Sequence, residues 1–405
     1  MVDCIKNYCD INIEKLENDL TKLSLLDPNF NTSNEVRQLY EKHKQTLINT
    51  IQAMTSDIQY YIDLYFDQWF QKALTNVLSV HIRRNDINQT MYELKQLQLP
   101  EQRSKEWYEI RENLLTASSL ADALGKGHFQ TRDGLLLNKT QETKQQNTQA
   151  SQDIMQWGVK YEPVATRFYE HLNNLTVVEF GLIPHPKLSV FGASPDGICD
   201  IDSPNGYEGR MLEIKCPPKR KFTHEVPLHY WMQMQGQLEV CDLEECDFLQ
   251  VKLEEYDDVK EYEEDVLMKD GIQHGYTSDG LPKGVILSYK ENNNYEYLYS
   301  PWLASLDEIL NWVNQQTQKF PDKQLDQRWW KIDRYECTLV RRDKEWWLSV
   351  VPDIIKFWEE VVHYRKVGNE EVQKRINSRK RGPRKKVFTI QEPLKGYLMD
   401  SDDEN

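Results

Sequence analysis

Apolar residues recur at every third or fourth position through much of the first hundred residues. One such stripe follows the tetrad TSNE (32–35), whose hydroxyl and carboxylate suit a capping box at the start of a helix. The stripe consists of Val36, Tyr40, His43, Leu47, Ile51, Met54, Ile58 and Tyr61. This spacing predicts amphipathic helices, so we expect residues 1–100 to form a helical accessory region that packs on a core further along the chain. A coiled-coil surface for a partner protein is the alternative.

The pattern changes after a polar, low-complexity segment at 138–153, which we expect to be a solvated loop. A helical stretch at 157–172 is followed by short β-rich runs, by one further helix near 229–240, and by another β-rich run. Strands joined by turns and helices predict an α/β (α+β) core with a central sheet flanked by helices, over residues 101–300.

The C-terminal third of the chain is more varied. Two segments, 284–290 and 295–301, predict edge strands of the same sheet. The tryptophan-rich residues 301–364 predict amphipathic C-terminal helices that pack on the core. From residue 365 to residue 405 the chain is strongly basic and then acidic, and we expect a disordered tail there.

Composition narrows the class of protein. With 39% hydrophobic and 11% aromatic residues the chain can build ordered cores, and no stretch approaches the roughly 20 apolar residues that span a bilayer. The start of the chain lacks the charged and apolar regions of a secretory signal, and the seven cysteines form no CxxC pair. We therefore expect a soluble intracellular protein without membrane contact, disulfides or structural zinc.

The net charge of −15 argues at first against a nucleic-acid partner, although the distribution of charge matters more. Residues 365–405 hold eleven Lys or Arg and seven Asp or Glu, so residues 1–364 carry a net charge of −19. Contact between the body of the protein and DNA would therefore need a local basic channel. The basic tail would tether DNA or act as a nuclear-import signal, and a solubilising tail without a specific partner is the alternative.

Three carboxylates and a lysine suggest a site for a divalent cation. Asp196 lies in the turn SPDG (194–197), while Glu213 and Lys215 lie two positions apart in a predicted strand and so share one face. Glu162 belongs to the helix predicted before them. Carboxylate oxygens select Mg²⁺ or Mn²⁺, and a nearby lysine can orient or deprotonate an attacking water. Taken alone, however, this short pattern is better explained by a turn aspartate beside an ordinary strand salt bridge.

Five segments in a fixed order make the pattern specific: EWYEIRENLLTAS (106–118), WGVKYE (157–162), ASPDG (193–197), LEIKCP (212–217) and YWMQMQ (230–235). Together they resemble the lambda-exonuclease branch, also called YqaJ-like viral recombinases, of the PD-(D/E)xK nuclease superfamily. The resemblance covers about residues 104–256. It implies a restriction-endonuclease-like core with a central mixed sheet, and the hydrolysis of DNA.

The resemblance also implies a metal centre with two ions, Mg²⁺ or Mn²⁺. Asp196 and Glu213 would be its main ligands, and the Ile214 carbonyl would complete the first site. Glu162 would help to hold a second cation, and Lys215 would contact the nucleophilic water.

Further residues would support this centre or contact DNA. Gln233 matches a helix glutamine that helps to position the metal site. Arg111 and Ser118 match a pair that grips a phosphate, in the best-known relative the 5′-terminal phosphate, and an arginine fork suits that task because it meets two oxygens at once. Ser194 would place a hydroxyl near the scissile phosphate. Basic side chains past the catalytic strand would contact the DNA backbone or simply be solvated; these are Lys219, Arg220 and Lys221.

These expectations combine into a metal-dependent deoxyribonuclease, specifically a 5′→3′ exonuclease on double-stranded DNA ends that acts in viral recombination or repair. A structure-selective endonuclease is the first alternative, and a catalytically silent DNA-binding module is the second. The expected partners are DNA ends and a single-strand annealing protein. The extensions at both ends of the chain leave the oligomeric state open. The expected location is the host cytoplasm or a viral factory, or the nucleus through the basic tail.

Overall fold

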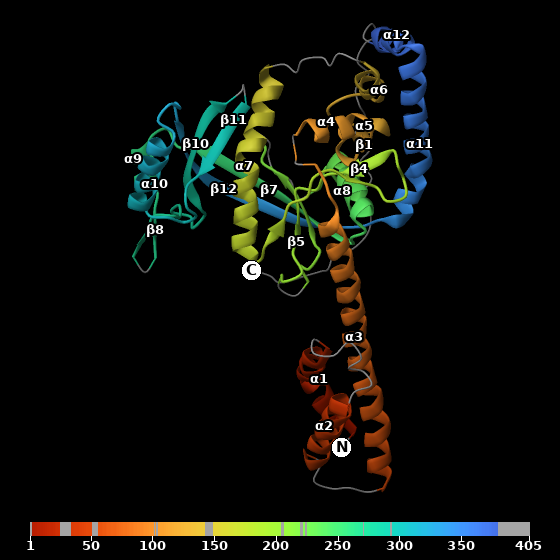
Figure 1. Ribbon diagram of the computed structural model, residues 1–405. Helices are drawn as coiled ribbons and strands as arrows, with labels where there is room; N and C mark the ends of the chain where they lie inside the picture. The colour runs from red at the N-terminus through yellow and green to blue at the C-terminus, as the bar shows by residue number, and fades with distance from the viewer. Residues whose placement is uncertain are drawn as a thin grey trace, which may run out of the picture.

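The computed structural model describes residues 2–24, 34–50, 56–100, 102, 104–141, 149–203, 206–218, 222, 225–269, 271–291 and 294–379. A seven-stranded mixed sheet has helices on both faces, and a group of helices projects from one end of this body (Figure 1). Among the helices that the structure describes, none combines the length and the apolar character that crossing a membrane requires.

The large sheet joins strands from distant parts of the chain. In order, it contains β11 (Asn294–Tyr299), β10 (Lys283–Glu291), β12 (Asp326–Arg341), β7 (Glu245–Glu255), β6 (Met211–Lys215), β5 (Gly197–Cys199) and β2 (Val177–Val178). β6 and β7 run parallel, and every other neighbouring pair in this order is antiparallel. A parallel pair needs a crossover connection, which α8 (Leu228–Cys241) supplies. The predicted mixed sheet flanked by helices is confirmed.

Smaller sheets and further helices complete the body. One small sheet has the order β1 (Leu115–Thr116), β4 (Phe191–Ala193) and β3 (Ile183–Pro184), and another pairs β8 (Leu267–Met268) with β9 (Ile272–Gln273). The other helices of the body are α4 (Lys105–Glu112), the short turn η2 (Ala117–Ser119), α5 (Leu120–Ala123), α6 (Arg132–Thr140), α7 (Gln149–Asn173), α9 (Val259–Glu264), α10 (Leu306–Lys319), α11 (Lys344–Val367) and α12 (Glu370–Arg379).

Alternation along β6 divides its side chains between two cores. Met211 belongs to the core on the α8 side of the sheet, while Leu212 and Ile214 belong to the core beneath α7. Because successive strand residues face opposite sides, Glu213 and Lys215 face α8. The strand therefore presents two charged side chains to this helix.

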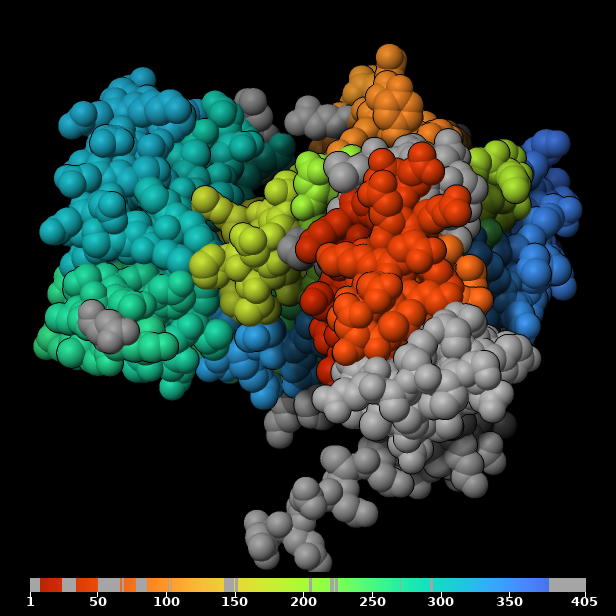
Figure 2. All heavy atoms as spheres, turned by 90° about the horizontal axis from the view of Figure 1, so that it is seen from below, coloured from red at the N-terminus to blue at the C-terminus, as the bar shows by residue number. Residues whose placement is uncertain are grey.

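The N-terminal part consists of α1 (Val2–Ser24), α2 (Asn34–Thr50) and α3 (Ser56–Gln96). All three helices enclose a core of their own that includes Leu47 and Phe66. The end of α3 instead belongs to the body, because Met91 is fully buried there and Lys95 pairs with Asp200 at 2.5 Å. Seen from below, the N-terminal helices stand in front of the body (Figure 2). The first two residues of the TSNE tetrad lie outside the described residues, and its last two begin α2.

The segment 301–364 differs from its prediction. It is helical at α10 and α11, but between them it forms β12, with 16 residues the longest of the described strands. β12 runs antiparallel beside β7 and buries Trp330 and Ile332. Tryptophan and isoleucine suit the buried face of a strand as well as that of a helix, so composition could not distinguish a strand from a helix here. The core predicted for 101–300 therefore extends through β12.

The expected disordered tail at 365–405 begins as ordered helix. α11 continues to Val367, and α12 follows and packs on α6. Val372 is fully buried and Ile376 packs against the same core. These two residues, four positions apart, give α12 an apolar face that its strongly charged composition obscured. The segment 380–405 lies outside the described residues.

Two smaller predictions also need correction. The expected loop at 138–153 is helical at both ends, because α6 continues to residue 140 and α7 starts at residue 149. The segment contains no proline or glycine, which permits this extension of the helices. The segment 284–290 is an inner strand, since β10 lies between β11 and β12; of the two predicted edge strands, β11 alone lies at an edge of the sheet.

A buried lysine holds the end of a short helix beside the main sheet. Lys283 is only 2% exposed, and its ammonium donates hydrogen bonds to the backbone carbonyls of Tyr262 and Asp265 at the end of α9. Its Nζ also lies 3.9 Å from the centroid of the Tyr262 ring. Burial, which removes the ammonium from water, lowers the pKa of Lys283 to about 8.

This shift predicts a pH-dependent stability. Since the unfolded lysine keeps a pKa near 10.5, the unfolded chain binds more protons between about pH 8 and 10.5, and Lys283 makes the fold more stable as pH rises through that range. We expect wild type to gain about 2 kcal/mol relative to Lys283→Met between about pH 7.5 and about pH 9.5, measured by urea denaturation. A difference that stays constant across this range would contradict the prediction.

Candidate active site

Asp196 is held against β6 by a backbone hydrogen bond. The residue lies in the turn between β4 and β5, and β5 begins at Gly197, which pairs with Leu212. This pairing brings Oδ2 of Asp196 to 2.6 Å from the amide nitrogen of Ile214, which donates to it. A Cβ at Gly197 would lie 2.1 Å from Cγ1 of Val177, so a glycine lets the turn pack closely on β2. The carboxylate is therefore fixed beside the middle of the sheet.

Glu213 and Lys215 meet on the α8 side of β6, as their spacing predicts. Glu213 is fully buried, and its Oε1 accepts hydrogen bonds from the Lys215 ammonium and, at 2.6 Å, from Nε2 of Gln233. Its Oε2 accepts from Nε2 of Gln237 at 2.7 Å. The sequence reasoning missed Gln237, although it lies one helical turn after Gln233 on α8.

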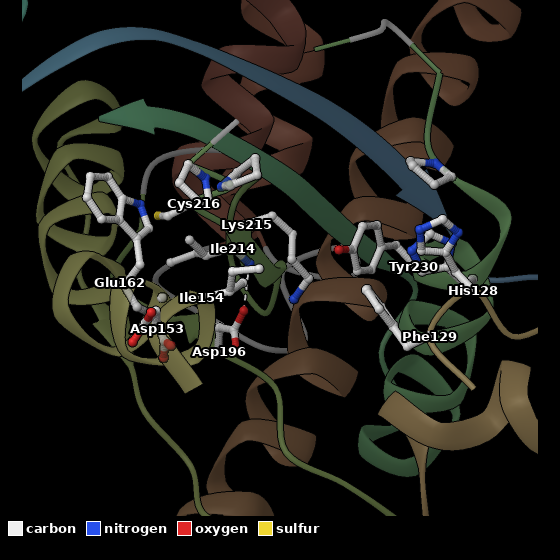
Figure 3. Close-up of a pocket in the computed structure, with 16 residues that line it drawn as sticks. His128, Phe129, Asp153, Ile154, Glu162, Asp196, Ile214, Lys215, Cys216 and Tyr230 are labelled. Atoms are coloured by element: carbon white, nitrogen blue, oxygen red, sulfur yellow. Dashed lines mark hydrogen bonds between the residues drawn. The ribbon is translucent and has the colours of Figure 1, made fainter. Parts of the chain in front are cut away.

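A cavity of about 1090 Å³ opens beside these residues. Glu162 from α7, Asp196 from the turn, and Ile214 and Lys215 from β6 all line it. Figure 3 shows Glu162 on one side of the cavity, with Asp196 and Lys215 nearer its middle. The fully buried Glu213 lies behind this surface. The structure thus brings together the four charged residues singled out in the sequence.

Negative charge is concentrated around Asp196. Burial and then the repulsion from Glu213 and Glu162 raise the pKa of Asp196 well above its usual value, and the charge of Lys215 offsets only part of this. Burial alone would lower the pKa of Lys215, but the attraction of Glu213 and Asp196 outweighs it and raises the pKa. Lys215 is therefore a charged ammonium. Three carboxylates against one lysine favour the presence of a further cation.

The donor atoms suit a hard divalent cation. Asp196, Glu162 and the Ile214 carbonyl offer only oxygen, which Mg²⁺ and Mn²⁺ prefer. Within the described ranges, no three His, Cys, Asp or Glu side chains are close enough together to hold an ion by themselves. Backbone, water or phosphate oxygens would have to complete the coordination. Glu213 already accepts three hydrogen bonds, so its role as a direct ligand stays a prediction.

Arg111 and Ser118 form a second polar pair. Nη2 of Arg111 donates to Oγ of Ser118 at 3.1 Å, and the guanidinium lies 4.9 Å from the centroid of the Trp107 ring. The Ser118 hydroxyl also lies 3.1 Å from that of Thr116 in β1. β1 pairs with β4, the strand that leads to Asp196, so one small sheet connects this pair with the carboxylates. The binding of a phosphate by the pair stays a prediction.

Two cationic side chains hold the end of α4, the helix that carries Arg111. Nζ of Lys139 donates to the carbonyls of Arg111 and Leu114, both at 2.7 Å. Arg365 from α11 donates to the Glu112 carbonyl at 2.8 Å and to the Lys139 carbonyl at 3.0 Å. Cations suit this position because the last carbonyls of a helix lack partners within the helix. The sequence carried no local signal of these contacts, since Arg365 lies far along the chain.

The remaining predicted contacts are less well defined. Oγ of Ser194 is buried and has no hydrogen-bond partner among the described residues, and the residue lies two positions before Asp196. Lys219, Arg220 and Lys221 lie outside the described residues.

Comparisons with known proteins relate this site to a family. Residues 106–244 match the model of the YqaJ-like viral recombinase domain. An uncharacterized protein of Acanthamoeba polyphaga mimivirus is 29% identical to the chain over 319 residues, which cover 71% of this chain and 56% of that protein. The chain therefore spans just over half the length of this relative.

Two solved structures are also similar. An alkaline exonuclease (LHK-Exo) from Laribacter hongkongensis matches with a TM-score of 0.39 and 21% identity, over 67% of this chain and 99% of that chain. A phage related exonuclease from Haemophilus somnus matches with a TM-score of 0.34 and 11% identity, over 65% of this chain and 98% of that chain.

The fold and the site define an α/β protein whose carboxylate and lysine side chains meet at a parallel strand pair. Residues 106–244 are similar to the YqaJ-like viral recombinase domain. This domain contains every described candidate residue from Arg111 to Gln237. The resemblance predicted from the five ordered segments is confirmed over residues 106–244.

The contacts of Arg365 predict a local effect of its removal. Arg365→Ala should speed amide hydrogen exchange in α4 and lower the free energy of unfolding by about 1 kcal/mol, because charged donors to helix carbonyls are lost. Hydrogen-exchange mass spectrometry and urea denaturation measure the two effects. The neighbouring exposed Lys366, changed to alanine, is the matched control. Equal exchange of α4 in both variants would show that Arg365 does not hold the helix.

Proposed function

We propose that the protein is a divalent-metal-dependent deoxyribonuclease that degrades double-stranded DNA from the 5′ end. The observation that carries this proposal is the meeting of Asp196, Glu213 and Lys215 at β6, beside an open cavity. The similarity of residues 106–244 to the YqaJ-like viral recombinase domain supports a role in viral recombination or repair. The remaining 3′ single strands would then be taken up by a separate annealing protein.

Hydrolysis of a phosphodiester needs an attacking water and compensation of the developing negative charge. Asp196, Glu162 and the Ile214 carbonyl would hold a Mg²⁺ or Mn²⁺ ion, which would supply Lewis-acid polarisation and an activated water. Lys215 donates hydrogen bonds to the water or to a phosphate oxygen. Glu213 accepts from Lys215 and so keeps the ammonium charged and oriented. The two glutamines of α8 hold the Glu213 carboxylate in place.

The Arg111–Ser118 pair gives the proposed enzyme its preference for ends. Burial lowers the pKa of Arg111, yet the guanidinium stays charged because its usual pKa is far above neutrality. A half-buried guanidinium beside a hydroxyl suits a terminal phosphate, which offers oxygens to both groups. An internal phosphate offers fewer charged oxygens, so the pair favours chain ends.

Digestion of a linear duplex, labelled separately at each 5′ and 3′ end, tests the proposal beside a closed circle. We expect Mg²⁺-dependent release of the 5′ label first, no cutting of the circle, and no activity in a chelator. Cutting of the circle would favour a structure-selective endonuclease. Complete inactivity on all of these substrates would contradict the proposal and favour a silent DNA-binding module.

Asp196→Asn and Lys215→Met should each reduce the rate of hydrolysis by at least about 100-fold, because one loses a metal ligand and the other the charge beside the phosphate. DNA binding, measured by fluorescence anisotropy, should stay close to wild type. Asp257→Asn, which changes an exposed aspartate outside the site, is the control and should keep wild-type rates. Near-normal hydrolysis by purified Asp196→Asn protein would refute the site.

Arg111→Ala should slow the digestion of 5′-phosphorylated ends more than that of 5′-hydroxyl ends. A lost charge-assisted contact is worth roughly 1.5–3 kcal/mol, so the preference between the two substrates should shrink by about ten-fold or more. Lys105→Ala removes a positive charge from the same helix at an exposed position and is the matched control. An unchanged substrate ratio in Arg111→Ala would exclude Arg111 as the reader of the terminal phosphate.

A further inference from the structure

Four aromatic residues form one wall of the cavity, and we call them the aromatic wall: His128, Phe129, His229 and Tyr230. The rings of His128 and His229 are stacked, with centroids 5.0 Å apart and 12° between their planes. Phe129 meets His229 edge to face at 5.4 Å, and Tyr230 lies 4.1 Å from His229. Figure 3 shows the labelled members across the cavity from Glu162.

Internal packing does not account for Phe129, the outermost member of the aromatic wall. The Phe129 side chain is 73% exposed, so it forgoes most of the roughly 1.5–3 kcal/mol that burial of a phenyl ring provides. The loop that carries it is nevertheless tightly held. A Cβ at Gly127 would lie 1.8 Å from Oδ1 of Asp122, and Gln130 hydrogen-bonds to the same aspartate. An exposed ring on a constrained loop at the mouth of a cavity is typical of a binding surface.

The aromatic wall is continuous with the proposed catalytic residues. Nζ of Lys215 lies 5.1 Å from the centroid of the Tyr230 ring, and the other rings follow from Tyr230 outward. A phosphate that accepts a hydrogen bond from Lys215 would therefore lie at the inner end of the aromatic wall. The adjoining nucleotide of the same strand would extend along the rings. Ile154, 59% exposed, stands on the opposite side and adds a second apolar surface.

We propose that the aromatic wall stacks on the nucleobase next to the phosphate that is cleaved, with Phe129 as the main contact. This inference rests on the proposed nuclease function. The rings offer π faces, which match the flat surface of a base. Stacking is indifferent to base identity, which suits an enzyme that must process every sequence. Phe129 thus positions the strand and takes no part in the chemistry.

Abasic substrates combined with Phe129 variants test this inference. The substrates are 5′-phosphorylated duplexes that are intact or carry one abasic nucleotide at the first or second position of the degraded strand. We expect wild type to lose roughly ten-fold in kcat/KM on one of the abasic duplexes. Phe129→Ala should lose a similar factor on the intact duplex and show no further loss on the abasic one. Phe129→Trp should restore wild-type behaviour, and Tyr92→Ala, at an exposed tyrosine on α3, is the control.

Two results would overturn the inference. One is a wild-type enzyme that cleaves intact and abasic duplexes equally well. The other is a Phe129→Ala enzyme that keeps the full abasic penalty, because another group would then contact the base.

Binding measurements separate this inference from the proposed function. In Asp196→Asn protein, anisotropy compares the affinities for intact and abasic duplexes with and without Phe129→Ala. If wild type cleaves no DNA but this Phe129-dependent difference in affinity persists, the nuclease proposal fails and the base contact stands. If the difference is absent as well, the base contact fails too.

Discussion

The buried carboxylate of Glu213 is the constraint on which the centre of this protein depends. A carboxylate without solvent contact costs several kcal/mol unless hydrogen bonds and an opposite charge compensate it. Lys215 supplies the charge, and Gln233 and Gln237 supply two amide donors from successive turns of α8. The helix must therefore turn this polar face toward β6. The crossover between the parallel strands β6 and β7 places it there.

The position of α8 also sets how closely the helix packs against β4 and η2, the two neighbouring elements of the site. A Cβ at Gly236 would lie 2.9 Å from the Phe191 ring in β4 and 3.2 Å from the side chain of Ala117 in η2. The glycine thus lets one helix pack closely on the strand that leads to Asp196 and on the turn that carries Ser118. α8 in this way sets the positions of Glu213, of the strand that leads to Asp196 and of the turn with Ser118, which explains how residues from separate segments form one surface.

The C-terminal extension also helps to position the residues of the site. α11 and α12 pack on the core beside α6, and Arg365 reaches the end of α4, so the helix with Arg111 depends on residues more than two hundred positions later. The basic composition of this extension suggested a mobile tail. In the structure, part of its charge satisfies helix carbonyls and part of its sequence buries an apolar face. Charge content alone does not distinguish a mobile tail from a packed helix, because most side chains are polar in both cases.

The sequence by itself determined the resemblance to the YqaJ-like viral recombinase domain, the central mixed sheet and the shared face of Glu213 and Lys215. Motif order does not depend on distant contacts, and strand alternation places Glu213 and Lys215 on one face wherever the strand lies. Only the tertiary structure decided that 326–341 is a strand, because β7 supplies its hydrogen-bond partners. It likewise decided that Gln237 reaches Glu213 and that Arg365 holds α4. Such contacts join residues far apart in the chain. Local propensity cannot predict them, because it depends only on neighbouring residues in the sequence.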